Sequence, residues 1–187
     1  MFVKDVLLMS AKYLGLREVC DYLSSESNES NDQVIDDIEK LTLSINMATT
    51  KIASEYFELV EESVISPSTK FVEFQSITDK NIIEIKNCYG ENSSAINFNL
   101  HLNGVSSDSN ISRIRYSFFP KELSIDDSID FFNKINVYTI AAGVVGEYLF
   151  LKGDFEESYV WDERFKNSLK SILRVKRNIV TPSKGWL

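Results

Sequence analysis

Histidine and cysteine, which often act as bases, nucleophiles or metal ligands, are scarce in this chain. It contains one histidine, His101, and two cysteines, Cys20 and Cys88. One histidine and two distant cysteines do not make a zinc site of the usual spacing. Cys88 and His101 could be drawn as a nucleophile–base pair, but Cys88 lies near an expected turn with no activating cation close in the sequence. We therefore expect an exposed His101, two structural cysteines, and no catalytic residue, metal or cofactor.

Carboxylates gather at two places where the sequence also predicts helix starts. Asp126, Asp127 and Asp130 form one group, and Glu156 with Glu157 forms the other. Acidic residues favour the positive end of a helix, so we interpret both groups as structural. The chain has no glycine-rich phosphate loop and no G-x-S-x-G motif. An enzyme would need two acids that converge in a pocket with perturbed ionisation, and this stays open as an alternative.

The charge of the chain is divided between an acidic body and a basic end. The last 24 residues, from Arg164 to Leu187, hold seven of the 20 Lys and Arg residues and none of the 28 Asp and Glu residues. Such an asymmetry is informative about partners rather than about fold. A basic end that closes on Trp186 suggests docking on an acidic partner, including another copy of the same body. The alternative is a solvated helix with a frayed end, and the acidic body argues against nucleic-acid binding.

Positioning these residues requires helices at both ends of the chain and a sheet between them. Apolar residues three and four apart from Val34 to Leu59 predict one long amphipathic helix. Alternating apolar and polar residues then predict strands, and the short turns at 79–81, 90–94 and 104–110 favour antiparallel pairing. The expected helices cover residues 3–13, 16–23, 32–61, 124–132, 137–151 and a last segment from 154, and the expected strands cover 70–77, 82–89, 95–102 and 111–119.

The last two expected helices carry signals for packing. Gly143 and Gly146 allow another backbone to approach the first of them closely. The second has two neighbouring stripes, because residues three and four apart share a helix face. The apolar stripe contains Trp161, Phe165, Leu169 and Ile172, and the basic stripe contains Lys166, Lys170, Arg174 and Arg177.

Neither helical part is large enough to bury its apolar face alone, so we expect the N-terminal and C-terminal helices to pack together. The predicted fold is α+β, a helical bundle with an inserted small antiparallel β-sheet lobe. We place the bundle at residues 1–66 and 120–187 and the lobe at 67–119. The chain shows no membrane-spanning segment and no secretory leader pattern, so we expect a protein made in a cytoplasm and without membrane contact.

Three segments together resemble one known family. They are VLLMSAKYLGL near the start, RIRYSFFPKEL at the end of the last expected strand, and IAAGVVGEYLFLKGDFEESYVWDERFKNSLKSILR near the C-terminus. In this order, with a β lobe between helices, the chain resembles the head–tail connector (adaptor) proteins of tailed bacteriophages, including the gatekeeper-like tail tubular proteins of short-tailed phages. The resemblance is one of pattern and covers most of the chain.

The resemblance implies a structural subunit of a homo-oligomeric ring, usually twelve-fold, in the neck of a virion that is assembled in the host cytoplasm. Such a ring joins the portal protein to tail proteins, and DNA passes its lumen without sequence-specific binding. An acidic body would suit a wall along which DNA slides. In the family the C-terminal segment reaches a neighbouring subunit or the portal. The corresponding partner-binding residues here are Arg174, Lys176, Arg177, Lys184 and Trp186.

A second interpretation is a cytoplasmic, non-enzymatic adaptor or immunity-type protein. Such a protein would bind an acidic partner through the same basic end, but as a monomer or dimer. Oligomeric state therefore separates the two interpretations.

Overall fold

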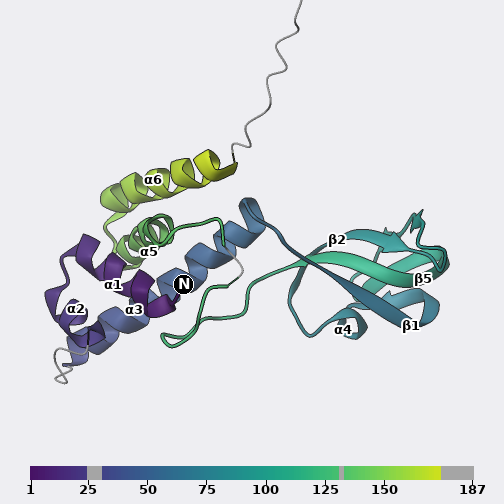
Figure 1. Ribbon diagram of the computed structural model, residues 1–187, viewed down its shortest axis with the longest axis horizontal. Coiled ribbons are helices and arrows are strands. Elements are labelled where there is room, and N and C mark those ends of the chain that lie inside the picture. Colours follow the sequence, from purple (N-terminus) through teal and green to yellow (C-terminus); the bar gives the residue numbers. More distant parts are fainter. Residues whose placement is uncertain (25–30, 131–132, 174–187) are drawn as a thin grey trace, which may run out of the picture. The chain divides into compact units, whose positions relative to one another are not determined.

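The computed structural model describes residues 1–24, 31–130 and 133–173, which form an α+β fold and confirm the predicted fold class (Figure 1). The helices are α1 (Val3–Leu14), α2 (Arg17–Leu23), α3 (Asp32–Glu55), α4 (Phe74–Ile77), α5 (Val137–Lys152) and α6 (Phe155–Leu173). The strands are β1 (Leu59–Glu73), β2 (Ile82–Tyr89), β3 (Ala95–Ile96), β4 (Asn99–Leu100) and β5 (Gly104–Phe118).

The chain divides into two compact units, each described here by itself. The helical unit comprises Met1–Ile45 and Ile125–Leu187, and the sheet unit comprises Asn46–Ser124. The first boundary falls within α3, so this helix contributes residues to both units.

Helix α5 is the most buried helix of the helical unit. Side chains such as Ile140 and Val144 are inaccessible, and the helix is apolar around its whole circumference, which is typical of a helix surrounded by other elements. Helices α1 and α6 pack against it (Figure 1). The rings of Tyr13 in α1 and Trp161 in α6 lie 5.1 Å apart between centroids. N-terminal and C-terminal helices therefore pack together, as predicted. Across the described ranges, no helix combines the length and the apolar character of a membrane span.

The short helix predicted over residues 124–132 is wrong for its described part, residues 124–130. This segment pairs with the N-terminus instead. The amide of Val3 donates to the carbonyl of Asp127 at 3.0 Å, and the amide of Ile129 donates to the carbonyl of Met1 at 2.7 Å. Ile129 is buried. Pairing with a distant part of the chain thus satisfies the backbone groups that a local helix would have used.

Helix α3 ends earlier than the predicted range 32–61. It closes at Glu55, where the two following amides both donate to the carbonyl of Ile52. Strand β1 then begins at Leu59, which pairs with β5, so the β part starts before the predicted residue 67. The three-and-four spacing of apolar residues happens to continue across this boundary, and periodicity alone therefore assigned strand residues to the helix.

The sheet is antiparallel throughout, as predicted, and β5 is its central strand. The strand order is β1-β5-β2-β3, and β4 also pairs with β5. Residues 104–110, predicted as a turn, belong to β5. Gly104 lies so close to β1 that a Cβ there would be 2.4 Å from the carbonyl oxygen of Val72. The glycine therefore marks a close approach of two strands rather than a turn.

The predicted strand over residues 95–102 is two separate strands of two residues. Strand β3 pairs with β2, whereas β4 pairs with β5. Because the segment changes its partner strand, its alternating pattern does not continue on one buried face. Ile96 and Phe98 are half-buried, but Leu100 and Leu102 are 59% and 102% exposed. The alternation of apolar residues over 95–102 therefore does not mark a buried face in the second half of this segment.

Helix α4, a single turn, replaces the end of the predicted strand over residues 70–77. Its Ile77 is buried in the core of the sheet, and the hydroxyl of Ser63 donates to the carbonyl of Ile77 at 2.8 Å. The alternation of the last predicted strand, 111–119, holds from Ile114 to Tyr116, where only Arg115 is exposed, but it fails at Ser117, which is buried next to Tyr116. The buried members of this core are Val72, Ile77, Ile85, Cys88, Val105, Ile111, Ile114 and Tyr116.

Candidate interaction surface

The residues predicted to bind a partner lie in the last 14 positions of the chain. This range, 174–187, is outside the described residues. The role predicted for these positions stays a prediction. They are Arg174, Lys176, Arg177, Lys184 and Trp186.

The basic stripe predicted on α6 is described in its first part, where two cations already have partners. The ammonium of Lys166 lies 2.6 Å from a carboxylate oxygen of Asp162. The guanidinium of Arg164, beside the stripe, lies 5.0 Å from the ring of Trp161 and 5.8 Å from that of Tyr13. The contact of Arg164 with Tyr13 joins α6 to α1, whereas the Lys166 pair lies within α6. Lys166 is therefore already paired within the described part of the stripe.

His101 and the cysteines do not come together into a reactive site. The Nε2 atom of His101 lies 2.8 Å from the hydroxyl of Ser106, and the residue is exposed. Cys88 is fully buried, and burial raises the pKa of its thiol to about 11, so the neutral thiol dominates at neutral pH. In the part of the chain that the structure describes, no three residues of the His, Cys, Asp and Glu types are placed to hold a metal ion.

A group of exposed apolar side chains lies where α5 meets α6. We call it the aromatic corner and define it as Phe150, Leu151, Phe155, Tyr159 and Val160, which are between 38% and 65% exposed. The rings of Phe150 and Phe155 meet edge-on with centroids 5.4 Å apart. Tyr159 continues the surface along α6, because residues four apart share a helix face. Contiguous exposed apolar groups of this kind mark interaction surfaces.

A tight turn brings the two helices of the corner together. Gly153 ends α5 with φ of 89°, a left-handed conformation that glycine adopts without strain. Its amide donates to the carbonyl of Phe150 at 3.1 Å, and the amide of Asp154 donates to the carbonyl of Leu149 at 2.9 Å. The next helix starts at Phe155, so the hydrogen-bonded turn places Phe150 on one side and Phe155 on the other.

Close packing of α5 on α6 fixes which residues of α6 face outward. A Cβ at Gly143 would lie 2.9 Å from the ring of Phe165, and one at Gly146 would lie 3.3 Å from the backbone of α6. The hydroxyl of Ser158 donates to the carbonyl of Gly146 at 2.9 Å. The predicted close approach at these two glycines is confirmed. With Ser158 and Phe165 turned inward, Tyr159 is held on the exposed side of α6.

A buried charge cluster holds the last turn of α5 against α3. Asp37 is 5% exposed and accepts hydrogen bonds from the hydroxyl of Tyr148 at 2.7 Å, the ammonium of Lys152 at 2.8 Å and the amide of Gln33 at 3.2 Å. Tyr148 and Lys152 lie on either side of Phe150 in the sequence. The cluster therefore fixes the helix end that carries half of the aromatic corner.

Burial and hydrogen bonding shift the ionisation of this cluster in a consistent direction. Burial alone would raise the pKa of Asp37, but the hydrogen bonds from Lys152, Tyr148 and Gln33 outweigh it and hold that pKa below its usual value. Burial, together with the hydrogen bond to Asp37, raises the pKa of Tyr148 to about 12. The hydrogen bond to Asp37 raises the pKa of Lys152 despite partial burial. At neutral pH the cluster is an ion pair with a neutral tyrosine.

The buried role of Asp37 was not predicted from the sequence. The signal was present, because Asp37 follows Val34 by three positions and precedes Leu41 by four, on the apolar face. A charge on that face predicts a buried partner. The corner was also missed, because Phe155 and Tyr159 fall off the apolar stripe of α6.

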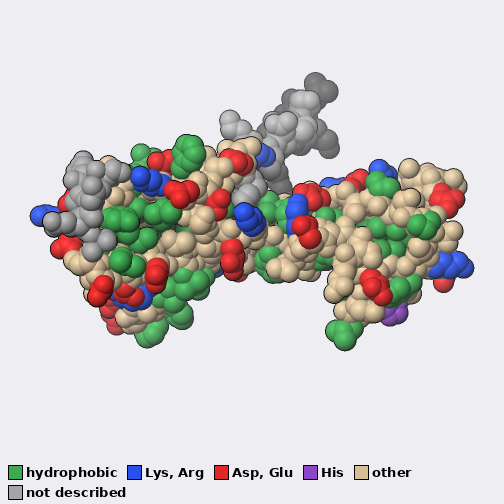
Figure 2. All heavy atoms as spheres, turned by 90° about the horizontal axis from the view of Figure 1, so that it is seen from below, with side chains coloured by type: hydrophobic (Ala, Val, Ile, Leu, Met, Phe, Trp, Pro, Cys, Tyr) green, Lys and Arg blue, Asp and Glu red, His purple; other side chains and the backbone are tan. Residues whose placement is uncertain are grey.

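Acidic side chains border the aromatic corner. Asp154, Glu156 and Glu157 are exposed, and within the described ranges none of them forms an ion pair. Lys152, the nearest cation in sequence, is bound to Asp37. Figure 2 shows another face, seen from below relative to Figure 1, on which hydrophobic side chains lie among both acidic and basic ones. The corner therefore combines an apolar centre with a negative border.

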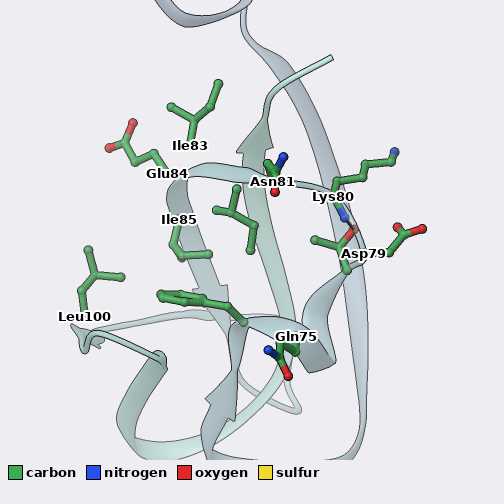
Figure 3. Close-up of a pocket in the computed structure, with 11 residues that line it drawn as sticks. Gln75, Asp79, Lys80, Asn81, Ile83, Glu84, Ile85 and Leu100 are labelled. Carbon is green, nitrogen blue, oxygen red and sulfur yellow. Dashed lines mark hydrogen bonds between the residues drawn. The ribbon is translucent and has the colours of Figure 1, made fainter. Parts of the chain in front are cut away.

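A second candidate is a groove of about 520 Å³ in the sheet unit (Figure 3). Its apolar side is formed by Phe74, Ile85 and Leu100, and its polar side includes Asp79 and Lys80. The groove runs beside β2. Among the described residues, the outer edge of β2 pairs with β3 at Cys88 and Tyr89, and it has no partner strand over Ile82–Asn87. Lys80 forms an ion pair with Glu61. The groove thus has one polar side, and among the described residues that line it no reactive side chains converge.

Comparison with known proteins gives no assignment. No protein-family model and no curated protein sequence matches this chain.

Proposed function

We propose that this protein is a structural subunit of a phage head–tail connector ring, which joins portal to tail and encloses the DNA channel. The observation that carries the proposal is the aromatic corner of α5 and α6. Aromatic residues are enriched and dominate binding energy at protein interfaces. A surface whose three rings are all more than half exposed is suited to burial against another subunit.

The position of the corner in the sequence supports the same function. The longest segment that resembles the connector family runs from Ile140 to Arg174, and its described part consists of α5, the turn at Gly153 and α6. The order of helices, antiparallel sheet and helices also agrees with the expectation for that family. The segment that carries the resemblance is thus the segment that carries the exposed aromatic residues.

A ring requires two different surfaces on each subunit, because a head-to-tail contact repeats until it closes. The aromatic corner supplies one of them. The proposal also includes the twelve-fold symmetry, the portal and tail partners, passage of DNA without sequence-specific contacts, and location in the neck of the virion. The acidic character of the chain, with 28 Asp and Glu residues against 20 Lys and Arg residues, is compatible with a channel that does not hold DNA.

Mass photometry with negative-stain imaging tests the proposal on the full chain, alone and with candidate portal protein. We expect rings, and we expect the double substitution Phe155→Ser with Tyr159→Ser to reduce them strongly. Val64→Ser, which removes an apolar side chain that is 75% exposed in the sheet unit, is the matched control. A wild-type protein that stays monomeric or dimeric and does not bind the portal protein would refute the ring and favour the adaptor interpretation.

A further inference from the structure

We propose that the aromatic corner binds residues 174–187 of a second copy of this chain, an inference that rests on the proposed ring. The aromatic corner is then the surface of one copy that residues 174–187 of another copy contact. The contact joins one subunit's C-terminal segment to the α5–α6 connection of the next, so each copy uses two different surfaces.

The chemistry of the segment complements that of the corner. Residues 174–187 contain four Lys or Arg residues and no Asp or Glu. The corner is bordered by Asp154, Glu156 and Glu157, and Lys152 does not neutralise them because its ammonium lies 2.8 Å from Asp37. Opposite charges at such a border steer two surfaces together and fix their register.

The apolar residues of the segment match the apolar centre of the corner. Ile179, Val180, Trp186 and Leu187 are apolar, and the corner presents the exposed rings of Phe150, Phe155 and Tyr159. Tryptophan buries a large ring at a low entropic cost, and aromatic pairs prefer the edge-on contacts that Phe150 and Phe155 already make. Trp186 is therefore the residue that we expect to contact the rings.

The arrangement of α6 suits a contact between copies, but it does not by itself exclude the chain's own segment, since 14 extended residues span up to about 46 Å; the fluorescence test below distinguishes the two. The corner includes the first turn of α6, at Phe155 and Tyr159, whereas residue 174 follows the other end of that helix at Leu173. At about 1.5 Å per residue, the 19-residue helix separates these ends by roughly 27 Å. A donor and an acceptor at opposite ends of one helix produce a head-to-tail contact, which closes into a ring when the rotation allows it.

Two full-length variants with complementary defects test the inference. The corner variant carries Phe155→Ser and Tyr159→Ser and keeps its segment. The segment variant carries Arg177→Glu and Trp186→Ser and keeps its corner. We expect each to associate with itself about 100-fold or more weakly than the wild type, since two interface anchors are lost. Mixed in equal amounts, they should form a one-to-one complex and stop there, because the remaining ends of that complex are both defective.

Analytical ultracentrifugation of each variant and of the mixture measures this outcome, with circular dichroism to compare folding. We expect the one-to-one complex to weaken about 10-fold when ionic strength rises from about 0.05 M to about 0.5 M, because salt screens charges at the border. A mixture that contains monomers alone overturns the inference, as do variants that assemble like the wild type.

Two results separate this inference from the proposed ring. If the wild type forms rings while both variants also form rings, the segment-to-corner contact is wrong and the ring stands on other surfaces. If the wild type is monomeric and its Trp186 fluorescence changes on Phe155→Ser, measured in a Trp161→Phe background, the segment binds its own corner and the contact between copies is wrong. A wild type that stays monomeric with portal protein present overturns the ring itself.

Discussion

Replacing Tyr148 with phenylalanine removes one hydroxyl from the buried cluster that positions the aromatic corner. The ring of Tyr148 is 4% exposed, and its hydroxyl donates to Asp37 at 2.7 Å. The substitution keeps the ring and deletes that hydrogen bond. Asp37 retains Lys152 and Gln33, so its charge stays paired and the fold is preserved.

The size of the effect follows from the charge on the acceptor. A hydrogen bond to a charged group contributes about 1.5–3 kcal/mol to stability. We therefore expect Tyr148→Phe to lower the free energy of unfolding by about 2 kcal/mol at neutral pH. The matched control is Tyr138→Phe on the same helix, where the tyrosine is 58% exposed, and we expect it to change stability by less than about 0.5 kcal/mol.

The pH dependence of the difference gives a second, independent test. Because the folded-state pKa of Tyr148 is raised from 10.0 to about 12, the hydroxyl contributes stability below pH 10 that is lost as the pH rises through 12. At about pH 11 this loss is about 1.4 kcal/mol in the wild type and absent in the variant. The stability gap between the two proteins should therefore narrow as the solution becomes alkaline.

Urea unfolding followed by circular dichroism at several values between pH 7 and pH 11 measures the gap for each variant. Tyrosines and lysines away from the cluster titrate in this range too, but they are common to both proteins and cancel in the difference. Lys152 does not cancel fully, because its pKa is raised mainly by Asp37 and in part by Tyr148. Equal stability of the two phenylalanine variants at neutral pH would refute the role of the cluster. A gap that stays constant up to pH 11 would refute a raised pKa for Tyr148.

Two further substitutions test packing in the two units, each by urea unfolding. In Gly143→Val, even the Cβ would lie 2.9 Å from the buried ring of Phe165, so we expect the free energy of unfolding to fall by about 2–3 kcal/mol. Unchanged stability would contradict the close contact of α5 with α6. Asn46→Ala removes a side chain that donates to the carbonyl of Leu123 at 3.0 Å and accepts from its amide at 2.7 Å, so we expect a loss of about 1–3 kcal/mol, against almost none for the exposed Ser54→Ala on the same helix.

Strong local signals made part of the fold predictable. The helix over 137–151 was found because an apolar run ends at Gly153, whose left-handed conformation closes α5. Gly143 and Gly146 predicted close packing, because glycine costs helix stability and, within a helix, allows another backbone to approach closely. The antiparallel sheet followed from short turns. These features depend on residues that are near one another in the sequence.

Features that depend on distant residues were not predictable in the same way. Residues 124–130 carry a helix-start pattern but pair with Met1 and Val3, and no local rule reports that competition. Strand β1 begins inside an apparent helical period because its pairing with β5 decides the backbone there. The segment over 95–102 alternates well, yet it is divided between two partner strands. Tertiary pairing overrides local preference at each of these places.

The aromatic corner is held in place before any partner arrives. The turn at Gly153, the contact of Ser158 with Gly146 and the buried cluster at Asp37 each fix one side of it. A surface that is already ordered loses little conformational entropy on binding, so its apolar area contributes more fully to affinity. Substitutions at Phe155 and Tyr148 should consequently act differently. The first removes a contact with the partner and leaves stability almost unchanged, whereas the second lowers stability and affects binding through the position of α5.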